Sequence, residues 1–240
     1  SRASFFDVTY ANSIFTASGH GGAIIYSSDG TSWASSDNVT SNQLYGVAYG
    51  GGIYLGVGDN YTLIYSFNGT TWGNMGSSGN SSINDIIYAN SNFYAIMDNG
   101  YIHICPNCIS SSINWTDAIN IGVSDDSNGI VYGNSSYVIV GASGTILTSP
   151  DGTTWTSRTS GTSESLIEIT YGNGTYVAVG TSGTILTSKD GITWTTAASG
   201  LTNNGTTVAL YGVTYGNNTY VAVGNANYGT GAVFPSTNGS

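Results

Sequence analysis

The sequence predicts an all-β fold, a six-bladed β-propeller of four-stranded antiparallel blades. A tyrosine opens each of six copies of one pattern, with a period of 39 to 44 residues, at Tyr10, Tyr49, Tyr88, Tyr132, Tyr171 and Tyr215. Within each copy apolar residues alternate with period two, as strands require. The 35 glycines, and the lack of an apolar stripe at helical spacing, argue against helices. A period of this size is typical of a propeller or a solenoid, and four separable strands in each copy favour the propeller.

The four strands follow one another in a fixed order within a copy. Alternation such as Ile169 and Tyr171 marks the first strand, and a Gly/Asn turn follows it. An apolar run with small residues, clearest at 176–180, forms the second strand, and a Gly-led run such as 183–187 forms the third. A Ser-x-Asp-Gly turn then leads to a tryptophan that begins a fourth strand rich in Thr and Ser. We therefore expect one domain with repeats at about residues 5–42, 43–81, 82–125, 126–164, 165–207 and 208–240, and with equivalent tryptophans at positions 33, 72, 115, 155 and 194.

The sixth copy is incomplete. Its turn reads Ser236-Thr237-Asn238-Gly239-Ser240, about two residues short of the expected tryptophan, so residues 208–240 supply only three strands. Residues 1–4 are similar to 157–160, which follow Trp155, and so are expected to act as a closing fourth strand. Such a strand either closes the ring within one chain or completes the sixth blade of a neighbour, which makes a polymer. A third reading is that the 240 residues are the ordered part of a longer protein.

The turn before the tryptophan resembles a known repeat. Ser-x-Asp-Gly-x-Thr-Trp is similar to the Asp-box, or BNR, repeat of sialidase-type propellers and of many extracellular repeat proteins. The resemblance covers nearly the whole chain and implies a propeller, here a non-catalytic one. It says little about function, because one fold carries many activities.

The box residues are predicted to be structural. A carboxylate or amide at this position accepts hydrogen bonds from the backbone two residues on, and glycine takes the positive φ. The tryptophan fills space between blades. The predicted turn residues are Asp29, Asn68, Asp151, Asp190 and Asn238.

The third copy departs from the pattern, because Cys105-Pro106-Asn107-Cys108 replaces the box. The two cysteines suit a redox pair, half of a zinc site or a small disulfide. A redox pair of the thioredoxin type needs a strand-to-helix context, and zinc needs more ligands than His103 adds. A structural disulfide between Cys105 and Cys108 is favoured, with no metal site and no cofactor.

Charge excludes several partners. Only 7% of the residues are charged, the net charge is −10, and the cations are Arg2, Arg158 and Lys189. Nucleic acid and anionic membrane surfaces are therefore poor partners. No apolar stretch approaches the 18 residues of a membrane span.

Sequons and low charge favour an extracellular or cell-surface glycoprotein. A surface so poor in charge must be solvated by hydroxyls, amides or sugars, although chance alone accounts for many of the Asn-x-Ser/Thr sites in a chain this rich in Asn, Ser and Thr. Besides Asn68 and Asn238 in box turns, the candidates for covalent glycans are Asn38, Asn60, Asn80, Asn114, Asn134, Asn173, Asn204 and Asn217.

We expect no enzymatic activity. The resemblance to sialidases implies an arginine triad on the substrate carboxylate, and the chain has only two arginines. Glycosidases need two facing carboxylates, and no motif pairs the acids available, which are Asp98, Asp125, Asp126, Glu164 and Glu168. Two classes remain: a structural or assembly protein that self-associates through its open sixth blade, and a lectin-like propeller that binds carbohydrate between its blades.

Overall fold

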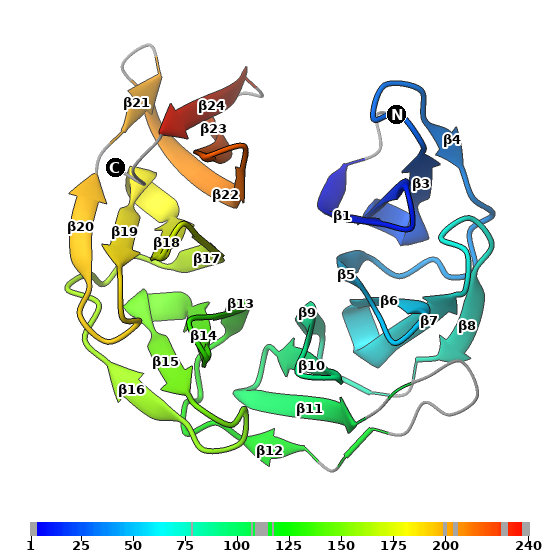
Figure 1. Cartoon of the computed structure of the whole chain (residues 1–240), viewed down its shortest axis with the longest axis horizontal. Coiled ribbons are helices and arrows are strands. Elements are labelled where there is room, and N and C mark those ends of the chain that lie inside the picture. Colours follow the sequence, from blue (N-terminus) through cyan, green and yellow to red (C-terminus); the bar gives the residue numbers. More distant parts are fainter. Residues whose placement is uncertain are drawn as a thin grey trace. The chain divides into compact units, whose positions relative to one another are not determined.

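The computed structural model describes residues 4–77, 79–106, 108, 115–116, 118–198, 201–203, 206–226 and 230–236. These residues form six antiparallel sheets with almost no helix, so the predicted six-bladed β-propeller is confirmed (Figure 1). The chain divides into two compact units, Ser1–Asn120 and Ile121–Ser240. Each unit carries three blades.

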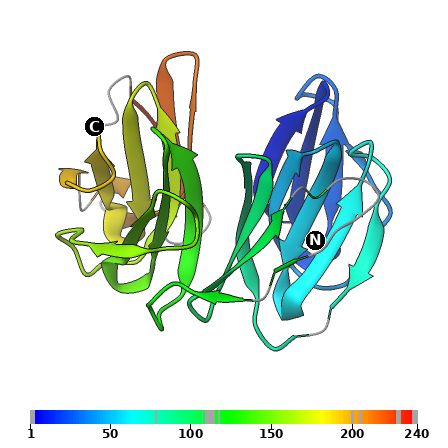
Figure 2. The ribbon, with the colours of Figure 1, turned by 60° about the horizontal axis from the view of Figure 1, so that its bottom comes forward.

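The first unit contains blades 1 to 3, in which consecutive strands pair in chain order (Figure 2). Blade 1 is β1 (Phe5–Ala11), β2 (Ile14–Gly19), β3 (Ile24–Ser27) and β4 (Ala34–Ser35). Blade 2 is β5 (Leu44–Gly50), β6 (Ile53–Gly58), β7 (Thr62–Ser66) and β8 (Gly73–Gly76). Blade 3 is β9 (Ile83–Ala89), β10 (Asn92–Met97), β11 (Tyr101–Pro106) and β12 (Ile119–Asn120).

The second unit contains blades 4 to 6. Blade 4 is β13 (Ser127–Gly133), β14 (Ser136–Gly141), β15 (Ile146–Ser149) and β16 (Thr156–Arg158). Blade 5 is β17 (Leu166–Gly172), β18 (Thr175–Gly180), β19 (Ile185–Ser188) and β20 (Thr195–Ala198). The last sheet is β21 (Thr202–Asn203), β22 (Thr206–Gly216), β23 (Thr219–Ala226) and β24 (Thr230–Ser236).

Helix is limited, in the described part of the chain, to four 3-10 turns of three residues, at His20–Gly22, Asp59–Tyr61, Ala142–Gly144 and Thr181–Gly183. None of the described helices has the length and apolar character needed to cross a membrane. The Gly/Asn turns between first and second strands are two-residue hairpins with positive φ, such as Asn173 and Gly174. Such turns suit the twist of the paired strands, and Asn and Gly adopt them readily.

In both units, buried tyrosines of second strands bond to the preceding blade, from blade 2 to blade 1, from blade 5 to blade 4 and from blade 6 to blade 5. The Tyr54 hydroxyl donates to Ala11 O in blade 1 at 2.7 Å. The Tyr220 hydroxyl donates in the same way to Gly172 O in blade 5. The core lies between neighbouring sheets and consists mainly of second-strand residues, because both faces of the second strands of blades 2 to 5 are covered.

Candidate functional site

The box turns are closed by a repeated set of hydrogen bonds, shown by the turn of blade 4. Ser149 Oγ accepts from Gly152 N at 2.8 Å and donates to Asp151 Oδ1 at 2.9 Å. Asp151 Oδ1 also accepts from the amides of Thr153 and Thr154, at 2.8 and 2.7 Å. Asp29, Asn68 and Asp190 make the same contacts in their own blades, whereas Asn238 lies outside the described residues.

These bonds favour the ionised form of the box carboxylates. The backbone amides of Thr193 and Ile192 lower the pKa of Asp190 to about 2. Equivalent amides hold the pKa of Asp29 and of Asp151 well below the usual range. A general acid needs a pKa near the working pH, so these groups brace turns and are unsuited to proton transfer.

Blade 3 replaces the hydrogen bonds of the box with a covalent link. Cys105 lies opposite Phe93, the place that Ser27 takes opposite Phe15 in blade 1. Cys105 forms a disulfide with Cys108, and both residues are buried. The disulfide therefore joins the positions that the serine hydroxyl and the glycine amide join elsewhere.

The tryptophan of blade 3 keeps its place despite the inserted residues. Thr116 N donates to Ile104 O at 2.8 Å, so the residue after Trp115 bonds to the third strand. Ala34, the residue after Trp33, pairs with Tyr26 of the third strand of blade 1 in the same way. Trp115 packs against the core of blades 2 and 3.

In the described part of the chain, the sixth blade ends on a strand that is paired along one edge. β24 pairs with β23, and no described strand lies along its other edge, because β21 pairs with the start of β22 instead. In complete blades the third strand directs alternate backbone groups outward, as in the bond from Ser36 N to Ile24 O. Val233 and Pro235 hold the equivalent positions of β24, so their carbonyls point to the open edge. Proline has no amide hydrogen, and it is tolerated on edge strands for that reason.

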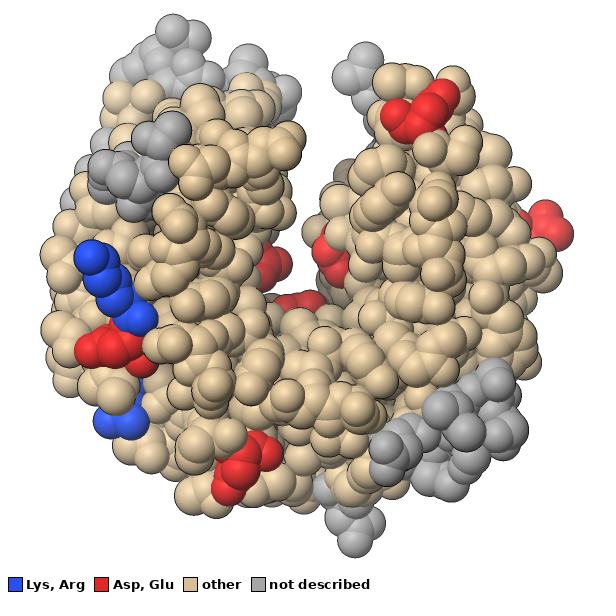
Figure 3. All heavy atoms as spheres, viewed as in Figure 1, with Lys and Arg blue, Asp and Glu red and all other residues tan. Residues whose placement is uncertain are grey.

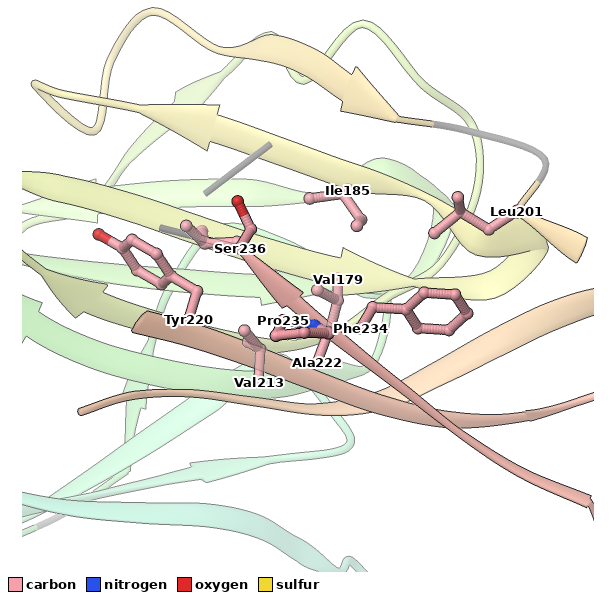
Figure 4. Close-up of a pocket in the computed structure, with 10 residues that line it drawn as sticks. Val179, Ile185, Leu201, Val213, Tyr220, Ala222, Phe234, Pro235 and Ser236 are labelled. Carbon is pink, nitrogen blue, oxygen red and sulfur yellow. The ribbon is translucent and has the colours of Figure 1, made fainter. Parts of the chain in front are cut away.

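An apolar hollow lies beside this edge, between blades 5 and 6 (Figure 4). Its volume is about 180 Å³. Its main lining residues are Val177, Ile185, Val213, Tyr220, Ala222 and Phe234. None of these side chains carries a charge.

The corresponding place between blades 4 and 5 holds a tryptophan. There Trp194 packs against a cluster that includes Ile146, Ile169, Tyr176 and Leu186. The strand pairings make these residues equivalent to Ile185, Val213, Tyr220 and Phe234, respectively. The hollow is therefore the tryptophan place of the sixth blade, and we call it the tryptophan slot.

Within the second unit, blade 6 also exposes apolar side chains on its other face. Val223 and Val233, which alternate with the slot residues Ala222 and Phe234, are 43% and 65% exposed. Their equivalents in blade 5 are Val179 and Ile185, which are buried. The far face of blade 6 is therefore an apolar surface of the kind that the other blades cover.

The N-terminal segment begins in blade 1. Ser4 O accepts from His20 N at 2.8 Å, and Phe5 lies opposite Gly19. Ser1 to Ala3 lie outside the described residues. The role of residues 1–4 as a closing fourth strand therefore remains a prediction.

Asp7 is a half-buried carboxylate that the repeat pattern did not single out. Its Oδ2 accepts from Val47 N in blade 2 at 2.7 Å, and its Oδ1 accepts from Val8 N at 2.6 Å. Burial raises the pKa of Asp7, against the lowering effect of these two amides. A signal was present in the repeat, since the residues that follow the bulge of each first strand alternate between acid and glycine: Asp7, Gly46, Asp85, Gly129, Glu168 and Gly212.

Of the other acidic candidates, Asp125 and Asp126 are exposed and three make structural contacts. Asp98 accepts from Ser82 N, Glu164 accepts from the hydroxyls of Thr181 and Ser182, and Glu168 accepts from Ile169 N. No group of three or more His, Cys, Asp or Glu among the described residues is placed to hold a metal ion. Figure 3 shows a face on which charged side chains are few and scattered.

Most of the candidate glycosylation sites lie on exposed turns. Asn134, Asn173 and Asn217 are exposed hairpin residues with positive φ, and Asn60 is an exposed residue of a 3-10 turn. The exposed Asn38 donates to Gly21 O, and Asn80 is exposed. Asn114 and Asn204 lie outside the described residues.

Comparison with known proteins supports the fold alone. A scan against protein-family models found no match, and a search of the curated proteins also found none. Among solved structures the chain is similar to YCF48 bound to a D1 peptide, with 19% identity, a TM-score of 0.72, and coverage of 98% of this chain and 78% of that one. It is also similar to YCF48 from Cyanidioschyzon merolae, with 14% identity, a TM-score of 0.70, and coverage of 99% of this chain and 83% of that one. A third similar structure is the computationally designed Ika8 protein, with 12% identity, a TM-score of 0.67, and coverage of 100% of this chain and 73% of that one.

Proposed function

We propose that this chain is a non-catalytic structural or assembly β-propeller, which associates through its sixth blade. The observation that carries the proposal concerns the second unit: no described strand of that unit lies along the outer edge of β24, and Val223 and Val233 are exposed on one face of blade 6. An exposed strand edge recruits another strand, and an exposed apolar patch marks an interaction surface.

One solved relative in fold supports binding to protein. YCF48 has been solved with a bound D1 peptide, so a protein of similar fold binds a peptide. At 19% identity the likeness does not carry the partner over to this chain. It supports only the class of function, which is the binding of a polypeptide.

We place the protein outside the cell or on its surface, with glycans on its loops. The support is the charged fraction of 7%, together with sequons such as Asn134 and Asn217 on exposed hairpins. Charge repulsion contributes little to the solubility of such a surface, and sugars would add to it.

A charge placed on the uncovered face tests the assembly. Val233→Lys puts an ammonium on a residue that is 65% exposed, so folding should be preserved. The control is Ile192→Lys, which adds the same charge at a residue that is 51% exposed in the box of blade 5. Sedimentation velocity should show association of the unchanged protein and of the control, and monomers of Val233→Lys. A monomeric parent protein, or equal association of all three, contradicts the proposal.

The carbohydrate-binding alternative has one observation in its favour. A polar hollow of about 350 Å³ in the second unit is lined by Glu164 and by hydroxyls that include those of Thr162, Ser182, Thr184 and Thr196. These groups suit a sugar, but no aromatic ring lines the hollow. A glycan array decides between the two, because a lectin binds defined sugars and an assembly protein does not.

A further inference from the structure

We infer that blade 1 opens away from blade 2 while the rest of the first unit stays folded, because the face that joins blade 1 to blade 2 is polar. We call this face the blade 1 seam and define it by Asp7, Thr16 and Ser18. The inference goes beyond the assembly role, since it concerns the motion of one blade within the first unit.

The strand pairings show which side chains of blade 1 face blade 2. Asp7 lies opposite Ser18, and Ser18 lies opposite Ile24, so these three side chains share one face of the sheet. Ile24 packs in a cluster with Leu44 of blade 2. Asp7 and Ser18 therefore face blade 2, as does Thr16, which lies two residues before Ser18 on the same strand.

The second-strand residues of the seam are polar where the other junctions within a unit are aliphatic. Thr16 and Ser18 are 0% and 1% exposed. The equivalent residues of blades 2, 4 and 5 are also buried, and they pack in clusters with the following blade. They are Leu55 and Val57, Val138 and Val140, and Val177 and Val179. The seam therefore lacks apolar burial that stabilises the other junctions.

The two buried hydroxyls of the seam are poorly satisfied. Thr16 Oγ1 donates to Gly69 O of blade 2 at 3.4 Å, which is long for a hydroxyl donor. Ser18 Oγ has no hydrogen-bond partner among the described residues. A buried hydroxyl without a partner costs free energy in the closed state and regains water when the seam opens.

Hydrogen bonds contribute much of what holds blade 1 to blade 2. Asp7 Oδ2 accepts from Val47 N, and the Tyr54 hydroxyl donates to Ala11 O, each at 2.7 Å. Among the described residues, the strands of blade 1 add only Ile24 and the partly buried Ala11 to the apolar cluster of this junction. Because water replaces hydrogen bonds at a small net cost, the seam opens more easily than an apolar junction.

Blade 1 can leave blade 2 without breaking a strand ladder. Among the described strands, those of blade 1 pair only with one another. Opening uncovers apolar residues of blade 2, which include Leu44, Val47 and Tyr54. In native proteins the regions with few buried apolar contacts open first, and the elements that move are drawn from them.

Thiol labelling of the folded protein tests the opening. Ser18→Cys places a thiol in the seam, and Val57→Cys places one at the equivalent position between blades 2 and 3. Both positions are buried, so a reagent reaches either thiol only when its junction opens. Ser18→Cys should be labelled at least about tenfold faster, because the seam keeps Thr16 where the other junction buries Leu55.

Hydrogen exchange of single amides, measured by NMR, provides the second arm. Val47 N donates across the seam, whereas Ile86 N donates to Asp85 of its own strand, so Val47 should exchange faster. Ser18→Val introduces the residue that blades 2, 4 and 5 hold at this position. It should slow the exchange of Val47 at least about fivefold, the effect of removing one unpaired buried hydroxyl. Ser35→Val, the same substitution on the exposed strand β4, is the matched control and should not slow it.

The outcomes separate the opening of blade 1 from the assembly role. Equal labelling of Ser18→Cys and Val57→Cys overturns the inference, as does exchange of Val47 that Ser18→Val does not slow. If Ser18→Cys does not fold, the exchange of Val47 still decides the question. Val233→Lys acts in the second unit, so rapid exchange of Val47 is expected in that variant and in the parent protein alike. An opening that only one of these two proteins shows would depend on association and would overturn the inference.

Discussion

Two tryptophans with the same local bonds and different burial allow the packing between blades to be measured. Trp72 and Trp33 each donate from Nε1 to the carbonyl of the box glycine, so replacement by alanine removes the same hydrogen bond from each turn. Trp72 is 7% exposed and lies in a cluster with Ile24 of blade 1, whereas Trp33 is 40% exposed. The difference in the free energy of unfolding between Trp72→Ala and Trp33→Ala therefore measures the packing of Trp72 against the neighbouring blade.

The structure sets the size of the difference. Burial of a tryptophan covers about 200 Å². One third of that area, the difference in exposure, corresponds to about 65 Å² and to about 1.6 kcal/mol at about 25 cal/mol per Å². Replacement of a buried tryptophan also leaves a cavity, so Trp72→Ala should lower the free energy of unfolding by about 3 to 5 kcal/mol. Trp33→Ala should lower it by about 2 kcal/mol.

Urea unfolding followed by far-UV circular dichroism measures both variants, because tryptophan fluorescence would itself change. The slope of the transition has to stay constant for the comparison to hold. Equal destabilisation by the two substitutions, or a loss below about 1 kcal/mol for Trp72→Ala, would show that the box tryptophans do not stabilise the packing between blades.

Three further outcomes follow from the turns and loops. Cys105 and Cys108 should resist thiol labelling without reductant, and reduction should remove about 2 kcal/mol at most, since the loop is short; hydrogen exchange that rises outside blade 3 would contradict this. The pKa of Asp190 is lowered, so its stabilising effect is complete above the unfolded pKa near 3.8 and is lost as the pH falls toward about 2. Melting temperatures of Asp190→Asn should therefore lose part of their acid sensitivity, and a curve parallel to that of the unchanged protein would refute the assignment. Glycopeptide mass spectrometry should find Asn68 without a glycan, because a glycan there crowds the blade edge. The loop sites expected to carry glycans are Asn38, Asn80, Asn134, Asn173 and Asn217. Full occupancy of Asn68 with empty loop sites would contradict this prediction.

The architecture was predictable because it depends on local pattern. Alternation of apolar residues, Asn/Gly hairpins and the Ser-x-Asp-Gly turn each act over a few residues, and their repetition defined six blades. The three strands of the sixth copy could also be counted. The brief β21 strand was not expected, since Thr202 and Asn203 carry no distinct strand signal and extend β22 only through a local hairpin.

The candidate site could be predicted only in part. The incomplete sixth copy indicated an open edge, but the slot was not foreseen. Its walls come from Val177 and Ile185 of blade 5 and from Tyr220 and Phe234 of blade 6, which are up to 57 residues apart in the chain. Asp7 was missed for a similar reason, because its bond to Val47 links residues that are 40 positions apart.

By itself, then, the sequence determined the strands, the turns, the number of blades and the poverty of charge, since these follow from neighbours along the chain. The tertiary structure decided which tryptophans are buried, which carboxylate bonds to the neighbouring blade and where an apolar hollow remains. Those properties depend on packing between blades, and packing places side chains together that the sequence separates by a whole repeat.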